Sequence, residues 1–247
     1  HRYERMPMKQ AMADALARGE NFSHFGPEAN LFDKLEELFR VYGETGTGQK
    51  RYYLHSLEEA TEHNARLGVD LGPGQFTPWE EIPSGTDLLF YEGLHGGVRG
   101  EGYNVAALAD LLVGVVPITN LEWIQKLHRD KSKRGYSTEA VTDTILRRMY
   151  DYVHYICPQF ALTNINFQRV PIVDTSNPFI ARWIPTPDES MVVIRFANPR
   201  GIDFPYLLSM IHDSFMSRPN SIVIPGGKMA LALQLILTPM IWKLAAE

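Results

Sequence analysis

The sequence predicts an α/β fold in which helices cover a mostly parallel sheet. Two continuous apolar segments, Asp87–Gly93 and Leu111–Ile118, lack the alternation of a half-exposed strand and are typical of strands covered on both faces. Longer segments with apolar residues at helical spacing lie between and after them. Strands that alternate with helices indicate a single layered domain over residues 1–247, with ligands expected at the carboxyl ends of the strands.

Apolar periodicity places the elements in chain order. A helix is expected over 27–42, ending at Gly43, and loop-rich segments follow at 43–49 and 71–85. The other expected helices lie near Ala106 and over Asn120–Lys131, Ser137–Ile156 and Met229–Leu244. The other expected strands are Ile165–Val173, Met191–Phe196 and Ser221–Pro225.

Composition narrows the classes of function. The formal net charge of −5 argues against bulk nucleic-acid binding, which requires a positive field to displace counterions. We find no apolar run long enough to span a bilayer and no signal-peptide pattern, so we expect a cytoplasmic protein without a membrane partner. Cys157 is the only cysteine, which excludes an internal disulfide and a cysteine-based zinc site and favours a buried structural thiol.

The segment Gly43–Arg51 superficially matches a phosphate-binding loop, G-x-x-x-x-G-K-[ST]. The match fails at the positions that carry the mechanism, because Gln49 replaces the lysine and Lys50 is followed by Arg51 rather than by a hydroxyl that binds magnesium. The segment also follows a helix, whereas the motif requires a strand before it. We interpret it as a turn, and no phosphate-binding loop lies in these residues.

Glu92 stands near the end of the first expected strand. An acid in this place can meet the magnesium ion of a nucleotide, as acids do in phosphotransferases that contain a phosphate-binding loop. The alternative is an acid that only caps the following turn.

The basic segment Lys126–Arg134 carries five cationic side chains and one acid, Asp130, in an otherwise acidic protein. A lone carboxylate among cations stays ionised, so it can hold a metal or orient a hydroxyl while the cations meet phosphate oxygens. Phosphoryl transfer requires such positive groups around the charge that develops on the transferred group. The alternative is a solvated helix with ion pairs between residues four apart.

Five segments closely resemble the phosphoribulokinase family, in its bacterial class. They are LLFYEGLHG at 88–96, VVPITNLEWIQKLHRD at 115–130, RGYSTEAVTD at 134–143, NFQRVPIVDTSNPFIARWIP at 166–185 and NPRGIDFPY at 198–206. The resemblance covers essentially the whole chain. It implies a P-loop kinase fold of the nucleoside-monophosphate-kinase kind, with a mixed sheet flanked by helices. It also implies phosphorylation of D-ribulose 5-phosphate by ATP at O1, which gives ribulose 1,5-bisphosphate for carbon fixation in the Calvin cycle.

The resemblance implies roles for particular residues. Glu92 and Asp130 correspond to the acids near Mg²⁺ and the phosphates, and the cations around the transferred group correspond to Lys126, Arg129 and Arg134. The residues implied in binding ribulose 5-phosphate are His1, Arg5, Tyr53, His55 and Arg134. A nucleotide lid, formed in part by residues 132–148, carries Arg147 and Arg148. Arg195 and Arg218 correspond to positions tied to allosteric nucleotides, with NADH activating and AMP inhibiting.

The chain departs from the family pattern at its start and in its cysteine content. The phosphate-binding loop of the family, its first strand and the aspartate thought to act as base all precede the position of His1, so we expect the chain to be an N-terminally incomplete fragment. The lone Cys157 matches neither cysteine of relatives that thioredoxin regulates, so we expect the ligand-regulated class. That class forms octamers, and Met191–Phe196 is the expected edge strand for assembly. Two alternatives stay open: a related sugar or nucleoside kinase with another acceptor, and a non-catalytic protein that senses nucleotides or serves assembly.

Overall fold

The computed structural model describes residues 4–246, except for the side chains of Arg5, Lys133 and Arg134. The chain packs into two compact units. The helical unit consists of residues up to Ala109 together with Arg148–Gln159, and the sheet unit consists of Asp110–Arg147 and the residues from Phe160 onward.

The described part of the helical unit contains the helices α1, α2 and α3, two short antiparallel ribbons, the last residues of α5 (Thr138–Asp151) and the π-helix Tyr152–Ile156. The helices are α1 (Arg5–Ala17), α2 (Phe32–Thr45) and α3 (Leu57–Leu67). The ribbons pair β1 (Gln49–Lys50) with β2 (Glu80–Glu81) and β3 (Arg99–Gly100) with β4 (Tyr103–Asn104). Short 3-10 turns cover Pro27–Ala29 and Val105–Leu108. Phe32 and Leu35 of α2 pack against Val98 and Val105 to form the core of this unit.

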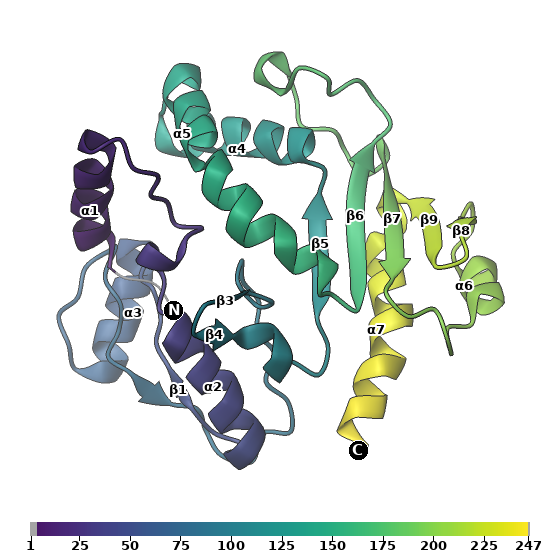
Figure 1. Cartoon of the computed structure of the whole chain (residues 1–247), viewed down its shortest axis with the longest axis horizontal. Coiled ribbons are helices and arrows are strands. Elements are labelled where there is room, and N and C mark those ends of the chain that lie inside the picture. Colours follow the sequence, from purple (N-terminus) through teal and green to yellow (C-terminus); the bar gives the residue numbers. More distant parts are fainter. Residues whose placement is uncertain (1–3, 247) are drawn as a thin grey trace. The chain divides into compact units, whose positions relative to one another are not determined.

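The sheet unit is built on five strands in the order β5-β6-β7-β9-β8 (Figure 1). The strands are β5 (Val113–Pro117), β6 (Ile165–Pro171), β7 (Ser190–Phe196), β8 (Phe215–Arg218) and β9 (Ser221–Pro225). Only β5 and β6 are parallel, and the other three pairings are antiparallel. Antiparallel strands need only short connections, such as the two residues between β8 and β9.

Helices cover this sheet and extend from it. The helices are α4 (Thr119–Arg134), α5 (Thr138–Asp151), α6 (Phe204–Met210) and α7 (Met229–Ala245), with shorter 3-10 turns at Pro178–Ile180 and Gly226–Lys228. Buried side chains of α6, α7 and the strands form the main core, which includes Phe167, Ile194, Ile222 and Ile236. A smaller cluster joins α4 to α5 through Leu127, Val141 and Ile145.

The mixed sheet flanked by helices confirms the fold implied by the resemblance, whereas the expectation of a mostly parallel sheet was wrong. Met191–Phe196 was also wrong as an edge strand, because β7 lies between β6 and β9 and the edges are β5 and β8. The expected strand over Asp87–Gly93 does not form, and Leu88 and Phe90 are 51% and 81% exposed. No strand within residues 4–246 pairs with it, and an apolar run without a neighbour has no hydrogen-bond ladder to join.

Two further expectations need correction. Among the described residues, the helical segment Gly226–Ala245 is long and apolar enough to cross a bilayer by length and composition, so the expected absence of such a run was wrong. Cys157 is half-buried rather than buried. It follows the π-helix Tyr152–Ile156, whose wider turn shifts the phase of the apolar stripe.

Candidate active site

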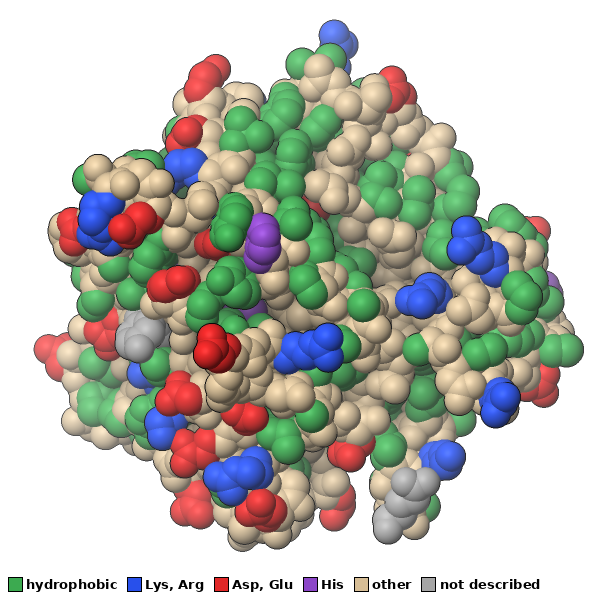
Figure 2. All heavy atoms as spheres, viewed as in Figure 1, with side chains coloured by type: hydrophobic (Ala, Val, Ile, Leu, Met, Phe, Trp, Pro, Cys, Tyr) green, Lys and Arg blue, Asp and Glu red, His purple; other side chains and the backbone are tan. Residues whose placement is uncertain are grey.

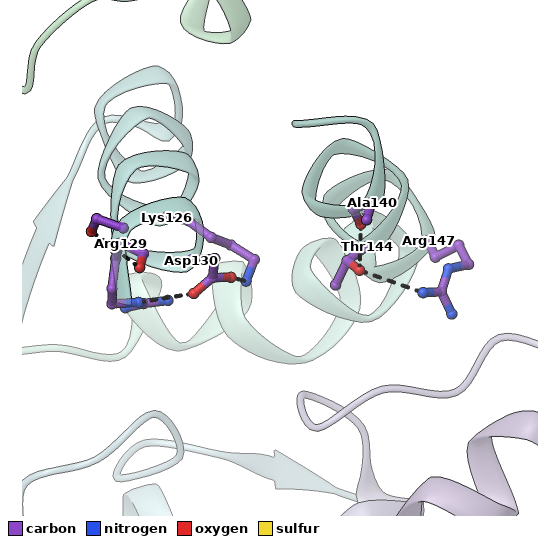
Figure 3. A network of polar contacts seen from close by, with 7 residues as sticks. Lys126, Arg129, Asp130, Ala140, Thr144 and Arg147 are labelled. Atoms are coloured by element: carbon purple, nitrogen blue, oxygen red, sulfur yellow. Dashed lines mark hydrogen bonds and ion pairs between the residues drawn. The ribbon is translucent and has the colours of Figure 1, made fainter. Parts of the chain in front are cut away.

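Helix α4 places Asp130 between two cations. Residues four apart lie on the same helix face, and Lys126 Nζ donates to Asp130 Oδ2 at 2.5 Å. Arg129 Nε donates to Asp130 Oδ1 at 3.3 Å, so both carboxylate oxygens accept from a positive group (Figure 3). Asp130 is only 3% exposed, whereas the side chain of Arg129 is 52% exposed. The structure therefore brings together Asp130, Lys126 and Arg129 as a buried anion with two cations.

The packing of α4 explains why this face is held firmly. Leu121, Ile124 and Leu127 are buried at spacings of three residues along the helix. The helix ends at Gly135, which adopts the left-handed conformation with φ 67°. Glycine adopts this conformation without the steric cost that a Cβ would bring.

The two arginines expected in the lid lie on α5. Arg147 Nε donates to Asp143 Oδ2 at 2.9 Å, and its terminal nitrogen Nη2 lies 3.5 Å from Thr144 Oγ1. Figure 3 shows the Arg147 side chain beside Thr144, apart from the Asp130 cluster. Arg148 is half-buried and begins the part of α5 that belongs to the helical unit. The structure therefore does not bring Arg147 into contact with Asp130.

Four of the expected site residues have no described place in this cluster. His1 lies outside the described residues, as do the side chains of Arg5 and Arg134. Glu92 is exposed and belongs to the helical unit. The joint metal role of Glu92 and Asp130 thus stays a prediction.

Tyr53 and His55 lie side by side in the helical unit. Their ring centroids are 4.8 Å apart with an interplanar angle of 76°. Glu59 Oε2 accepts from the backbone N–H of His55 at 2.8 Å and lies 3.3 Å from its Nδ1. The hydrogen bond from the His55 backbone is the main cause that lowers the pKa of Glu59, so a carboxylate is held beside the His55 ring.

Phe76 and Trp79, which stack with Arg51, were not predicted from the sequence, whereas Arg51 itself stood beside Tyr53 and His55 as a residue that could contact a sugar phosphate. The Arg51 guanidinium carbon lies 4.0 Å from the ring centroid of Phe76 and 4.6 Å from that of Trp79. Both aromatic residues are more than twenty positions away in the chain, so no local spacing indicates the contact. The sequence did offer one signal: Arg51, Tyr53 and His55 occupy alternate positions, which would place them on one face of an extended segment.

Arg195 and Arg218 line one cavity of about 640 Å³ in the sheet unit. Arg195 on β7 and Arg218 on β8 are both registered with Ser221 on the intervening strand β9. Side chains of residues directly opposite one another point to the same face of a sheet. Asn166 and Gln168 of β6 line the same cavity. On the face drawn in Figure 2, basic side chains lie over β7–β9, whereas acidic side chains gather over α2.

The false phosphate-binding loop is a turn only at residues 46–48, because α2 continues past its expected end at Gly43 to Thr45 and Gln49–Lys50 form β1. Thr45 is the last residue of α2, Gly46 caps the helix in the left-handed conformation with φ 71°, and β1 follows. A phosphate-binding loop instead opens a helix with its backbone N–H groups around the phosphates.

Asp130 and Glu92 have the hard oxygen donors that Mg²⁺ prefers. Within residues 4–246, no group of three or more His, Cys, Asp or Glu side chains is arranged to hold a metal ion. Mg²⁺ in kinases commonly takes one or two carboxylates and completes its six ligands with water and substrate phosphates. Asp130 and Glu92 belong to different units, so their joint role in holding a magnesium ion stays a prediction.

This chain is closely similar to proteins named phosphoribulokinase. Residues 1–176 match the model of the phosphoribulokinase / uridine kinase family. The chromosomal phosphoribulokinase of Cupriavidus necator is 69% identical over 99% of this chain and 82% of its own length. The phosphoribulokinase of Nitrobacter vulgaris is 68% identical over the same shares. The solved phosphoribulokinase from Rhodobacter spheroides matches with a TM-score of 0.90 at 61% identity, over 100% of this chain and 84% of that one.

The mixed sheet flanked by helices, shared with a solved phosphoribulokinase at a TM-score of 0.90, places the chain among the α/β phosphotransferases. The family match and the identity to curated relatives make the assignment narrower. The chain belongs to the phosphoribulokinase / uridine kinase family, on its phosphoribulokinase side.

Proposed function

We propose that this protein transfers the γ-phosphoryl group of ATP to O1 of D-ribulose 5-phosphate, giving ribulose 1,5-bisphosphate and ADP. The single structural observation that carries the proposal is the buried Asp130 between Lys126 and Arg129. The identity of the substrate is inferred from the relatives named phosphoribulokinase, which are 61% to 69% identical to this chain. The product is the acceptor of carbon dioxide in the Calvin cycle.

The cations of α4 act on the charge that develops during transfer. The O1–phosphorus bond forms, the bond from phosphorus to the ADP oxygen breaks, and the proton of O1 is released to solvent. Negative charge spreads over the equatorial oxygens in this transition state, and fixed positive groups stabilise it without reorganising. Lys126 and Arg129 supply those groups, and Asp130 holds both in place. Glu92 and Asp130 are the carboxylates that would hold Mg²⁺, and the ion would neutralise phosphate charge when it binds with ATP.

Roles in substrate binding are assigned residue by residue. Tyr53 and His55 of the helical unit present a hydroxyl and an imidazole that can hydrogen-bond sugar hydroxyls. His1, Arg5 and Arg134 supply cations for the 5-phosphate. Arg147 and Arg148 belong to the nucleotide lid. The support for these roles is the resemblance of the segments around them to the family, together with the contact between Tyr53 and His55.

Regulation by nucleotides is assigned to the cavity that Arg195 and Arg218 line. NADH activates and AMP inhibits in this proposal, and the two guanidinium groups bind their phosphates. Arg195→Ala is expected to abolish the response to NADH while activity without effector changes less than about twofold. A response to NADH that survives in Arg195→Ala would remove the residue from the effector site.

The protein is proposed to be cytoplasmic and to form a homo-oligomer, with eight subunits by analogy to the family. The support for assembly is the edge strand β8, whose Phe215 is 55% exposed. An edge strand of this kind offers unpaired backbone groups to a second subunit. The mass in solution, measured by light scattering, tests the number of subunits.

The experiment that tests the activity is ADP release by the protein expressed from its complete reading frame, with MgATP and ribulose 5-phosphate. We expect turnover that depends on ribulose 5-phosphate. Uridine, and sugar phosphates other than ribulose 5-phosphate, test alternative acceptors when they are added as competitors. Turnover with uridine alone would assign a different acceptor, and a folded protein without any turnover would leave a nucleotide-sensing or assembly role.

A further inference from the structure

An antiparallel ribbon holds Tyr53 and His55 in the helical unit. Beyond the pairing of β1 with β2, the backbone N–H of Leu54 donates to Gln75 O and that of Thr77 donates to Tyr52 O, both at 2.9 Å. Tyr53 is bridged to Phe76 in the same arrangement. Successive side chains of an extended chain point to opposite faces, so Arg51, Tyr53 and His55 share one face.

Arg51 is held between two aromatic rings on that face. Its guanidinium carbon lies 4.0 Å from the centroid of Phe76 and 4.6 Å from that of Trp79. A guanidinium over an aromatic face within about 6 Å is attracted by the negative ring face, and its planar shape stacks as an ammonium cannot. Burial lowers the pKa of Arg51, but arginine stays charged in proteins.

The contacts continue from Arg51 to the proposed substrate-binding residues. Phe76 is only 7% exposed, and its centroid lies 5.0 Å from that of Tyr53 at an interplanar angle of 65°. Tyr53 in turn meets His55 edge to face at 4.8 Å. Edge-to-face ring pairs have a preferred geometry, so fixing one ring restricts the next. Arg51 thus touches the start of a row of rings that ends at His55.

We propose that Arg51 is a positioning residue for the binding of ribulose 5-phosphate. By holding Phe76 in place against Tyr53, it fixes the orientation of Tyr53 and His55 before the substrate arrives. Binding groups that are ordered in advance lose less conformational freedom when the ligand binds. The proposal rests on the proposed function, in which Tyr53 and His55 contact that substrate.

The opposite face of the ribbon offers a matched control. There Arg66 forms an ion pair with Glu80, and its guanidinium carbon lies 5.9 Å from the ring centroid of Tyr52. Arg66 lies on α3, but it resembles Arg51 in residue type and in having an aromatic neighbour on the ribbon. Among the described residues, Arg66 contacts neither Phe76 nor Tyr53 nor His55, so replacing it should leave the row of rings unchanged.

Steady-state kinetics on Arg51→Met provide the test, because methionine keeps most of the aliphatic stem and removes the planar cation. We expect the KM for ribulose 5-phosphate to rise about three- to tenfold with kcat changed less than about twofold, and Arg66→Met to leave both unchanged. Arg51→Lys is expected to restore part of the loss, since an ammonium also binds a ring face. The Kd for ribulose 5-phosphate, measured by calorimetry without ATP, should rise by the same factor as KM.

A double-mutant cycle separates positioning from a general structural role. In a His55→Ala background, Arg51→Met should raise KM by a smaller factor than it does in the wild type. The effects of the two substitutions are not additive if Arg51 acts through His55. A full additional rise in that background overturns the proposal, and so does a joint loss of kcat and thermal stability. If His55→Ala and Tyr53→Phe raise KM while Arg51→Met does not, Arg51 alone loses its role. If none of the three variants raises KM, the substrate assignment of Tyr53 and His55 fails with it.

Discussion

Asp130 is buried and accepts two charge-assisted hydrogen bonds, so its negative charge acts directly on the two cations that it holds. A buried carboxylate held by Lys126 and Arg129 fixes both cations in one geometry. Asparagine has nearly the same shape but lacks the charge, and its amide nitrogen would face one of the two cations. The cations would then lose the anion that orients them.

Replacing Asp130 by asparagine is therefore expected to affect turnover more than binding. In steady-state assays, Asp130→Asn should lower kcat roughly 10²- to 10³-fold while the KM for ribulose 5-phosphate changes less than about threefold. Glu44→Gln is the control, because Glu44 also pairs with a cation four residues away, Arg40, but on the exposed surface of α2. Equal and small effects of both changes would contradict a catalytic role for the Asp130 cluster.

The residues that could be predicted are those whose partners are near in sequence. The four-residue spacing of Lys126 and Asp130 indicates one helix face, and the structure confirms the pairing. The 3% exposure of Asp130 was not predictable, because it depends on how α4 packs. The contacts of Arg51 with Phe76 and Trp79 depend on the pairing of distant segments, which no local pattern encodes.

The same distinction holds for whole elements. The strand Ser221–Pro225 and the helix that begins at Met229 agree with expectation, because each has a clear apolar pattern. Helix α3 was missed because Ala60 is its only buried residue among those the structure describes, so its apolar stripe is weak. Its start had another signal: the Ser56 side chain accepts from the backbone N–H of Glu59, as in the S-x-x-E capping pattern.

One glycine at the end of α4 and one inside α2 give a paired prediction about stability. Gly135 has φ 67° and open space where a Cβ would stand, so alanine there costs backbone strain alone. We expect Gly135→Ala to lower the free energy of unfolding by about 1 kcal/mol. Gly43 lies inside α2 with equal open space and is not among the glycines of positive φ, so Gly43→Ala should raise that free energy by about 0.5–1 kcal/mol. Denaturant unfolding measures both, and a shared sign would contradict the backbone argument.

At the scale of the whole molecule, the net charge and the local charge have opposite signs. The protein carries a formal net charge of −5, whereas the proposed function brings anionic substrates to Lys126 and Arg129. Salt weakens both the repulsion by the distant acids and the attraction by the nearby cations. Interactions beyond a Debye length, about 10 Å at roughly 0.1 M salt, are already largely screened. The remaining effect of added salt should therefore act on the cations at the site.

We accordingly expect the KM for ribulose 5-phosphate to rise about two- to fivefold as the ionic strength increases from about 50 to about 300 mM. The measurement is a series of KM values in potassium chloride, with kcat followed in parallel to exclude unfolding. Arg129→Gln removes the more exposed of the two cations, so its KM should start higher and respond less to salt. A KM that falls with salt would show instead that repulsion by the net charge of −5 governs the approach of the substrate.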